Sequence, residues 1–204
     1  NPSHVFAQPG YYHVVLTVTD SCIPAARATD DHVYVVVYPV EAAASANFTC
    51  GTPPLNVIFT GTAVGGEPPY TWSWSFGDGT PGSTLKNPSH SYLAVGSFTA
   101  TVTATDALGA TGTGSVVVAT TAPLQAVAAA SVTSGPAPLT VDLSSTVSGG
   151  TPPYTYDWNF GDGSQHSTSP GDQHTFIDPG AYSVLLTVSD SCGHSVVSPL
   201  SINA

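Results

Sequence analysis

The chain has 204 residues, of which 13 are acidic and only 2 are basic, so its formal net charge is −11. This charge repels phosphate backbones and anionic bilayers, which argues against a nucleic-acid partner and against binding to a membrane surface. No apolar run approaches the roughly 20 residues of a spanning helix and no apolar period of 3.6 is sustained, so we expect an all-β chain with no membrane insertion in this segment.

Residues 1–39 repeat the second half of a unit that returns later in the chain. Asn1-Pro2-Ser3-His4 recurs as Asn87-Pro88-Ser89-His90. A bare apolar sheet aggregates or finds strands elsewhere. We therefore expect either that upstream residues complete this half unit, which is the preferred interpretation, or that strands of a neighbouring chain do so. The side chains predicted to face its core are Phe6, Tyr12, Val14, Leu16, Val18, Val33, Val35 and Val37.

Residues 40–122 form the first complete unit. Its third predicted strand places Trp72, Trp74 and Phe76 on one face, because side chains alternate along a strand. Gly77-Asp78-Gly79 closes this strand, since glycine tolerates positive φ and an Asp side chain bonds amides two residues further on. We expect Trp74 to lie in the core; the alternative is that Trp72 and Trp74 stack on sugar rings.

Residues 123–204 repeat this unit 84 positions later, which carries Asp78 to Asp162 and Trp74 to Trp158. Trp158 is therefore predicted to be the central core residue. Short alternating strands separated by turn signals every 8 to 12 residues are typical of an antiparallel β-sandwich. The main predicted strands are Val127–Val132, Leu139–Leu143, Tyr154–Phe160, Tyr182–Val188 and Val196–Ile202.

Residues 156–190 carry a family resemblance. They read Tyr-x-Trp-x-Phe-Gly-Asp-Gly-Ser and then His-x-Phe-x-x-Pro-Gly-x-Tyr-x-Val-x-Leu-x-Val-x-Asp, a combination that resembles the PKD (polycystic kidney disease) domain. The resemblance implies tandem immunoglobulin-like β-sandwiches of the kind found in surface and secreted proteins. It implies the C-terminal half of a module over residues 1–39 and complete modules over residues 40–122 and 123–204.

Asp78 and Asp162 are the first residues to consider for catalysis. Each lies between glycines, and we find no recurring carboxylate, histidine or nucleophile beside it, so we interpret both as turn-formers. His4, His90 and His174 recur two residues before an aromatic residue, where we expect local hydrogen bonds. With no recurring nucleophile, paired acids, metal cluster or phosphate loop, we expect neither enzyme activity nor a cofactor.

Calcium is a weak candidate that the resemblance raises. Some PKD domains bind it through an Asp-x-Asp-Gly element before the Trp strand, together with the Asp that ends the Tyr-x-Val strand. Asp106 and Asp190 stand at the second of these places, but Gly65–Pro69 and Gly149–Pro153 replace the acidic element. One carboxylate with backbone carbonyls binds a hard cation weakly, so we do not expect a metal site.

The three cysteines allow two interpretations. Cys22 and Cys192 occupy the same loop position, between the last two strands of a unit, whereas Cys50 lies in the turn that joins the first two. These loops lie at opposite ends of such a sandwich, so in a head-to-tail array Cys50 could reach Cys192 and form a disulfide, which suits an oxidising exterior. The alternative is three buried or free thiols.

The functional expectation is a non-catalytic extracellular region, secreted or on the cell surface. Asn47-Phe48-Thr49 is a glycosylation candidate, and short proline-bearing joints such as Thr121–Leu124 indicate a semi-rigid array. We expect a stalk, filament or surface layer whose partners are neighbouring repeats, other copies of the chain, or surface protein or carbohydrate. The alternative is an accessory module that presents substrate to a secreted protease or glycoside hydrolase.

Overall fold

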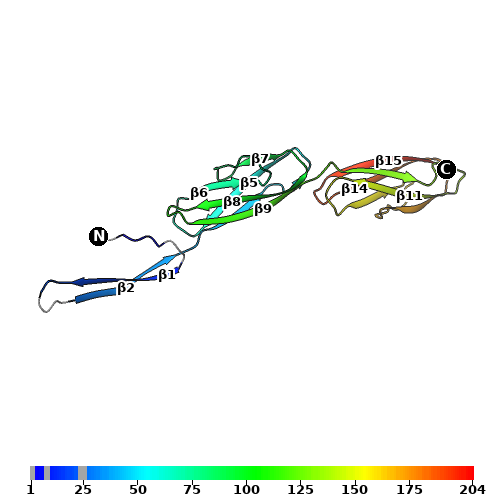
Figure 1. Cartoon of the computed structure of the whole chain (residues 1–204). Helices are drawn as coiled ribbons and strands as arrows, with labels where there is room; N and C mark the ends of the chain where they lie inside the picture. Colours follow the sequence, from blue (N-terminus) through cyan, green and yellow to red (C-terminus); the bar gives the residue numbers. More distant parts are fainter. Residues whose placement is uncertain (1–2, 7–9, 23–26) are drawn as a thin grey trace. The chain divides into compact units, whose positions relative to one another are not determined.

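The computed structural model describes residues 3–6, 10–22 and 27–204, and for residues 10–11 and 30–37 it describes the backbone alone. Every regular element in these ranges is a β-strand (Figure 1), so the predicted all-β, immunoglobulin-like fold is confirmed. The chain divides into two compact units. One comprises Asn1–Asn47, Val57–His90 and Phe98–Val118, and the other comprises Phe48–Asn56, Ser91–Ser97 and Ala119–Ala204.

An N-terminal hairpin is built from β1 (Gly10–Thr19) and β2 (Arg27–Val37), which pair antiparallel. The register shifts at a bulge between Val14 and Leu16. Apolar side chains of β1 lie open to solvent: the exposed fraction is 57% for Leu16 and 59% for Val18.

The first residues of this half unit also make one aromatic contact. The rings of Phe6 and Tyr12 pack with centroids 4.3 Å apart. The side chains of Val33, Val35 and Val37, which were predicted to face a core, lie outside the described residues.

We call β3–β9 the middle module. Its strands alternate inward apolar and outward polar residues, and they make a three-stranded and a four-stranded sheet. The first sheet has the order β3 (Glu41–Ala46), β5 (Leu55–Val64), β7 (Ser89–Tyr92). The second has the order β4 (Cys50–Gly51), β9 (Thr111–Thr120), β8 (Gly96–Thr105), β6 (Thr71–Ser75).

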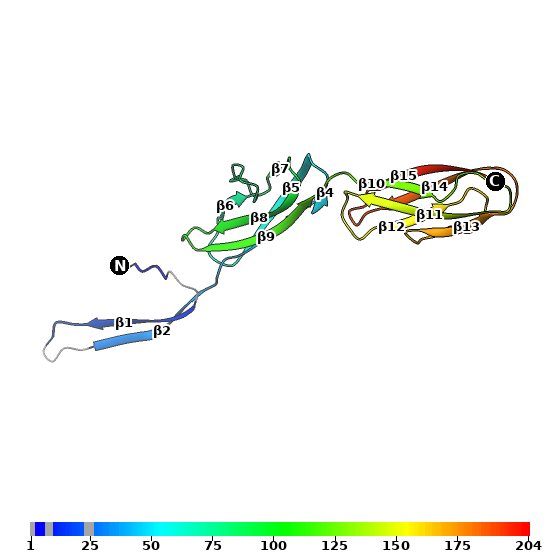
Figure 2. The ribbon, with the colours of Figure 1, turned by 45° about the vertical axis from the view of Figure 1, so that its right-hand side comes forward.

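We call β10–β15 the C-terminal module (Figure 2). One sheet has the order β10 (Gln125–Ala130), β11 (Leu139–Ser148), β13 (Asp172–Phe176), and the other has the order β12 (Thr155–Asn159), β14 (Ala181–Ser189), β15 (Ser195–Asn203). A single parallel bridge from Ser134 to Asn203 takes the place of β4. One bridge is too little for a strand, so this module has six strands, β10–β15, whereas the middle module has seven, β3–β9.

A tryptophan lies inside each complete module. Trp158 is fully buried and Trp74 is 2% exposed. Both indoles can lie there because each N–H has a partner: Trp158 donates to the Ser169 carbonyl at 3.1 Å and Trp74 donates to the Lys86 carbonyl at 3.3 Å. Trp74 therefore presents no ring to a sugar, and the half-buried ring of Trp72 lies 5.5 Å from the Lys86 ammonium.

Candidate functional site

Asp78 accepts three hydrogen bonds in the turn that follows β6. Gly77 and Gly79 flank it with φ of 80° and 81°, a backbone region that favours glycine. Its Oδ1 accepts from the Thr80 amide at 3.1 Å and from the Thr80 hydroxyl at 2.6 Å. Its Oδ2 lies 2.7 Å from His90 Nε2, a histidine on β7. The turn thereby fastens β7 to the end of β6.

The same arrangement recurs at Asp162 in the C-terminal module. Oδ1 accepts from the Ser164 amide at 3.0 Å and from the Ser164 hydroxyl at 2.6 Å, and Oδ2 lies 2.7 Å from His174 Nε2. The hydroxyl donor is Thr80 in the middle module and Ser164 in the C-terminal module, and its bond to the aspartate is the same in both. The network is therefore a property of the repeat and not of one module.

Each of these histidines also stacks on the phenylalanine that precedes the turn. The rings of Phe76 and His90 lie 4.1 Å apart and 2° from parallel, and those of Phe160 and His174 lie 3.9 Å apart and 4° from parallel. Phe76 and Phe160 are themselves core residues. Each imidazole is thus held between the apolar core and the aspartate.

The two aspartates are stabilised as anions. Burial opposes ionisation and alone raises the pKa of Asp78, but the bonds from the Thr80 hydroxyl, the His90 ring and the Thr80 amide outweigh it and lower that pKa from 3.8 to about 2. The same causes, with Ser164 and His174 as donors, lower the pKa of Asp162 to about 2. Both carboxylates therefore stay charged until strongly acidic pH.

This geometry does not match a hydrolytic triad, in which histidine stands between hydroxyl and carboxylate and takes the hydroxyl proton. Here the carboxylate stands in the middle, and the hydroxyl of Ser164 donates its proton to Asp162. A hollow of about 400 Å³ lies beside Asp162 and His174 and is also lined by Tyr182, whose hydroxyl donates to the carbonyl of Asp178 at 2.7 Å. The arrangement suits a structural clamp.

Two sequence-based interpretations of these residues were wrong. We expected no recurring histidine beside Asp78 and Asp162, and local hydrogen bonds for His90 and His174, yet each histidine bonds an aspartate twelve residues away. The turn-forming amide bond is present as well, so the aspartates do both. The constant spacing of the Asp and His positions in the two modules was the signal that could have revealed the pair. For His4 the structure gives an edge contact with the Phe6 ring at 4.7 Å.

Asp106 and Asp190 form a second repeated clamp. Asp106 directly follows β8, and Asp190 directly follows β14. Asp106 is 6% exposed; its Oδ2 accepts from the Glu67 amide at 2.9 Å, and its Oδ1 accepts from the amides of Leu108 at 3.0 Å and Ala110 at 2.8 Å. The bond from the Glu67 amide is the main cause that lowers the pKa of Asp106. The clamp thus ties the loop before β6 to the loop after β8.

Asp190 makes the corresponding bonds and one more. It accepts from the amides of Thr151 at 3.0 Å, Cys192 at 3.0 Å and His194 at 2.9 Å, and the His194 ring Nδ1 lies 3.1 Å from Oδ2. Burial by itself raises the pKa of Asp190, but the bonds from His194, Thr151 and Cys192 outweigh it and lower the pKa.

Glycine is needed where these carboxylates meet the facing loop. Gly66 and Gly150 have φ of 61° and 64°. A Cβ on Gly66 would lie 2.5 Å from Asp106 Oδ2, and one on Gly150 would lie 3.0 Å from Asp190 Oδ2. The glycine pair that replaces an acidic element in this chain therefore lets the backbone approach the carboxylate, whose oxygens then accept amide protons.

Among the side chains that the structure describes, which do not include those of residues 10–11 and 30–37, no group of three or more His, Cys, Asp or Glu is placed to hold a metal ion. The weak calcium candidates Asp106 and Asp190 direct their oxygens at N–H donors, which a cation would have to displace. The expectation that Asp106 and Asp190 form no calcium site stays a prediction to be tested.

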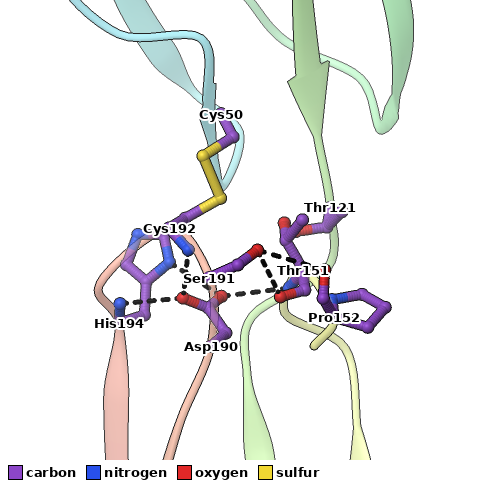
Figure 3. Close-up of a disulfide and its surroundings, with 8 residues drawn as sticks. All are labelled: Cys50, Thr121, Thr151, Pro152, Asp190, Ser191, Cys192 and His194. Atoms are coloured by element: carbon purple, nitrogen blue, oxygen red, sulfur yellow. Dashed lines mark hydrogen bonds and ion pairs between the residues drawn. A yellow bond between two sulfur atoms is a disulfide. The ribbon is translucent and has the colours of Figure 1, made fainter. Parts of the chain in front are cut away.

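A disulfide joins Cys50 of β4 to Cys192 in the loop between β14 and β15 (Figure 3). The two residues are 142 positions apart in sequence, and their Cα atoms are 6.0 Å apart. Both belong to the same compact unit. The predicted Cys50–Cys192 pairing is confirmed, and the alternative of three thiols is wrong. Cys22 is exposed and is not in a disulfide.

Hydrogen bonds continue the linkage around this disulfide. The Thr121 amide donates to the Gly51 carbonyl at 2.9 Å, and the hydroxyls of Thr121 and Thr151 lie 3.3 Å apart. The Ser191 hydroxyl donates to the carbonyls of Thr151 at 2.9 Å and Pro152 at 3.1 Å (Figure 3). The segment between β9 and β10 is thus bonded to the Cys50 turn and to the loop that lies beside Cys192.

The glycosylation candidate Asn47 is exposed and lies just before the Cys50 turn. Its side-chain Oδ1 accepts from the Ile58 amide at 2.7 Å, and its own amide donates to the Ile58 carbonyl at 3.1 Å. Glycan attachment at Asn47 remains a prediction. Within the described ranges, the structure contains no helix with the length and apolar character that a bilayer crossing requires.

Several solved structures resemble this chain. The fibronectin(III)-like modules of Clostridium thermocellum CbhA are 12% identical, with 79% of this chain and 93% of that chain covered and a TM-score of 0.47. The amphioxus IgVJ-C2 molecule is 13% identical, with 76% and 99% covered and a TM-score of 0.47. A 1.5-MDa bacterial ice-binding adhesin is 17% identical, with 88% and 68% covered and a TM-score of 0.38.

Sequence-family comparison gives a direct assignment. One PKD domain model matches residues 40–119, and a second PKD domain model matches residues 120–201. The two matches are adjacent and correspond to the middle and C-terminal modules. This chain therefore belongs to the PKD domain family.

Proposed function

We propose that this chain is a non-catalytic, extracellular structural and adhesive repeat region, whose covalently coupled PKD modules build a semi-rigid stalk, filament or surface layer. The observation that carries the proposal is the Cys50–Cys192 disulfide, which links a turn of the middle module to a loop of the C-terminal module. A covalent link between modules restricts hinge motion at their joint, which is what a load-bearing or spacing role requires.

Three further features support a structural role outside the cell. Disulfides persist in oxidising compartments. The repeated aspartates serve loop and turn geometry, and their hydrogen bonds leave no activated nucleophile. PKD domains are generally non-catalytic, and two of them stand in tandem here.

The partners that fit this role are neighbouring repeats and other copies of the chain, with surface protein or carbohydrate as further ligands. The formal net charge of −11 disfavours close like-charged neighbours at low salt, so lateral assembly should strengthen as ionic strength rises. Assembly between acidic faces should strengthen with salt. Assembly of an acidic face on a basic patch would weaken with salt, but this chain has only two basic residues.

Electron microscopy of the native protein on its own cells, with an antibody to the C-terminal module, tests the proposal. We expect label outside the cell on rods, filaments or an ordered layer, and Cys50 resistant to alkylation unless a reductant is added. Label confined to the cytoplasm, with Cys50 and Cys192 both alkylatable, would contradict it. If a protease or glycosidase domain is found on the same polypeptide, the alternative function applies, in which this chain is an accessory module that presents substrate.

A further inference from the structure

We propose that Cys22 is a second module-stapling cysteine, which forms a disulfide with the cysteine of a Thr-Cys-Gly turn in another PKD module. The inference extends the structural role proposed above. It rests on a bonded example in the same chain, because the equivalent cysteine, Cys192, is already joined to the Thr49-Cys50-Gly51 turn.

The loops that carry Cys22 and Cys192 begin in the same way, with an aspartate that bonds the cysteine amide. Each begins one residue after a long strand, with β1 ending at Thr19 and β14 ending at Ser189, and each reads Asp-Ser-Cys. The Cys22 amide donates to Asp20 Oδ1 at 3.1 Å, as the Cys192 amide donates to Asp190 Oδ1 at 3.0 Å. An aspartate therefore sets the backbone of both cysteines in the same way, and Cys22 is exposed.

The bonded pair also defines what Cys22 would meet. Cys192 is joined to a turn cysteine and not to another Asp-Ser-Cys loop. The turn presents Cys50 beside Gly51, where a Cβ would lie 2.7 Å from the end of the Leu55 side chain, so a larger residue there would require that side chain to shift. We therefore infer pairing between a loop cysteine and a turn cysteine, rather than between two Cys22 residues.

The distribution of cysteines predicts which module joints are stapled. The middle module has Leu108 at the loop position and Cys50 at the turn position, whereas the C-terminal module has Cys192 at the loop position and Ser134 at the turn position. Each described module thus carries one of the two cysteines. Leu108 thus leaves the middle module without a loop cysteine, while its Cys50 pairs with the loop cysteine of the C-terminal module.

The reaction is ordinary thiol–disulfide exchange with a small-molecule disulfide such as oxidised glutathione. The Cys22 thiolate attacks one glutathione sulfur, and one glutathione thiolate leaves. The turn-cysteine thiolate then attacks Cys22 Sγ in the mixed disulfide and releases the second glutathione. Two protein thiols lose two protons and two electrons, and oxidised glutathione becomes two reduced molecules.

The first test uses the complete chain with Cys192→Ser, which frees Cys50 as a turn cysteine. Incubated in a glutathione redox buffer, this variant should form covalent dimers and longer chains, and peptide mapping should recover Cys22 linked to Cys50 at about 2 Da below the sum of the reduced peptides. The wild-type chain should stay monomeric, because its own Cys192 occupies Cys50. Two controls are Cys22→Ser/Cys192→Ser, which should form no Cys22-containing oligomer, and Cys50→Ser, which retains two loop cysteines and should crosslink severalfold less.

Equal crosslinking of the Cys192→Ser and Cys50→Ser variants, or a predominance of Cys22–Cys22 links, would overturn the proposal. Folding of each variant is checked by the near-ultraviolet signal of the buried tryptophans. A second measurement does not depend on any variant: mapping of protein from its natural source should find Cys22 bonded to a Thr-Cys-Gly peptide. That peptide should come from a module other than the middle one, because Cys50 is already bonded to Cys192. A free Cys22 thiol in the natural protein would refute the pairing. A Cys22 disulfide could form even if the chain were an accessory module of a hydrolase. The outcome of this test is therefore independent of the proposed stalk function.

Discussion

At the scale of single residues, this repeat uses aspartates as hydrogen-bond acceptors that fix loops. Asp78 and Asp162 each gather a hydroxyl, an amide and an imidazole. Asp106 and Asp190 each gather several backbone amides. In a chain with 7% charged residues, four carboxylates in two repeated positions therefore have a clear structural purpose.

Acid should weaken the fold through these residues. The pKa of Asp78 and Asp162 is lowered to about 2 in the folded chain, below the 3.8 expected of an unperturbed Asp. Their contribution is therefore complete above about pH 4 and is lost as pH falls toward 2. Denaturant unfolding followed over this range should show the decline. The lowered pKa values of Asp106, Asp172 and Asp190 add to it.

Asp78→Asn/Asp162→Asn should reduce the free energy of unfolding at pH 7 by about 1–3 kcal/mol per site and make the acid dependence shallower. Asp157→Asn is the matched control, because this carboxylate is 49% exposed and bonds only the exposed His166 ring among the contacts described. An unchanged pH profile in the double variant would show that the Asp–His clamps do not stabilise the fold.

Calcium should have little effect on stability. The oxygens of Asp190 accept N–H groups from Thr151, Cys192 and His194, which leaves one carboxylate with no second acid to share a cation. Calorimetry with millimolar calcium and with a chelator should give the same Tm. A calcium-dependent rise in Tm that disappears in Asp106→Asn/Asp190→Asn would instead establish these residues as a cation site.

At the scale of elements, the two complete modules close one edge of the sandwich differently. In the middle module a Cβ on Gly112 of β9 would lie 2.3 Å from the Val40 carbonyl oxygen, so the backbones approach closely. In the C-terminal module the Ser198 hydroxyl of β15 accepts from the Ala128 amide of β10 at 3.0 Å. One edge is therefore closed by the absence of a side chain and the other by the presence of one.

Gly112→Ala should thus destabilise the middle module by about 1–3 kcal/mol, because the added methyl group meets a backbone oxygen that cannot move aside as a flexible side chain can. Val196→Ala alters the equivalent position of the C-terminal module, which already holds a side chain, and should cost about 1 kcal/mol through lost packing. Hydrogen exchange resolved by strand would assign each loss to its module. A Gly112→Ala variant as stable as the wild-type chain would contradict the close approach at Gly112.

Element-level features differ in how far sequence predicts them. Strand period placed Trp158 and Val184, Leu186 and Val188 correctly inside, because alternation is a local property. The Asp162–His174 contact depends on how β13 lies beside the turn after β12, which follows from tertiary packing. The Cys50–Cys192 pairing could be predicted from sequence, because the position of a loop in the repeat indicates at which end of the sandwich it lies.

At the scale of the whole molecule, we propose that the Cys50–Cys192 disulfide couples successive modules. Residues Phe48–Asn56 and Ser91–Ser97 of the middle module group with the C-terminal module in one compact unit. The Thr121 amide bond to Gly51 adds a backbone link beside Cys50–Cys192. A joint that is held by the polypeptide backbone and by a disulfide has fewer degrees of freedom than a joint that is held by the backbone alone.

Residual dipolar couplings in a weakly aligning medium test this coupling most directly. They are measured for the amides of the middle and C-terminal modules in the oxidised chain and in Cys50→Ser/Cys192→Ser, with Cys22→Ser as the control that keeps the disulfide. We expect one alignment tensor to fit both modules in the oxidised chain and in the control, and the double variant to require two tensors of different magnitude. Separate tensors in the oxidised chain, equal to those of the double variant, would contradict it.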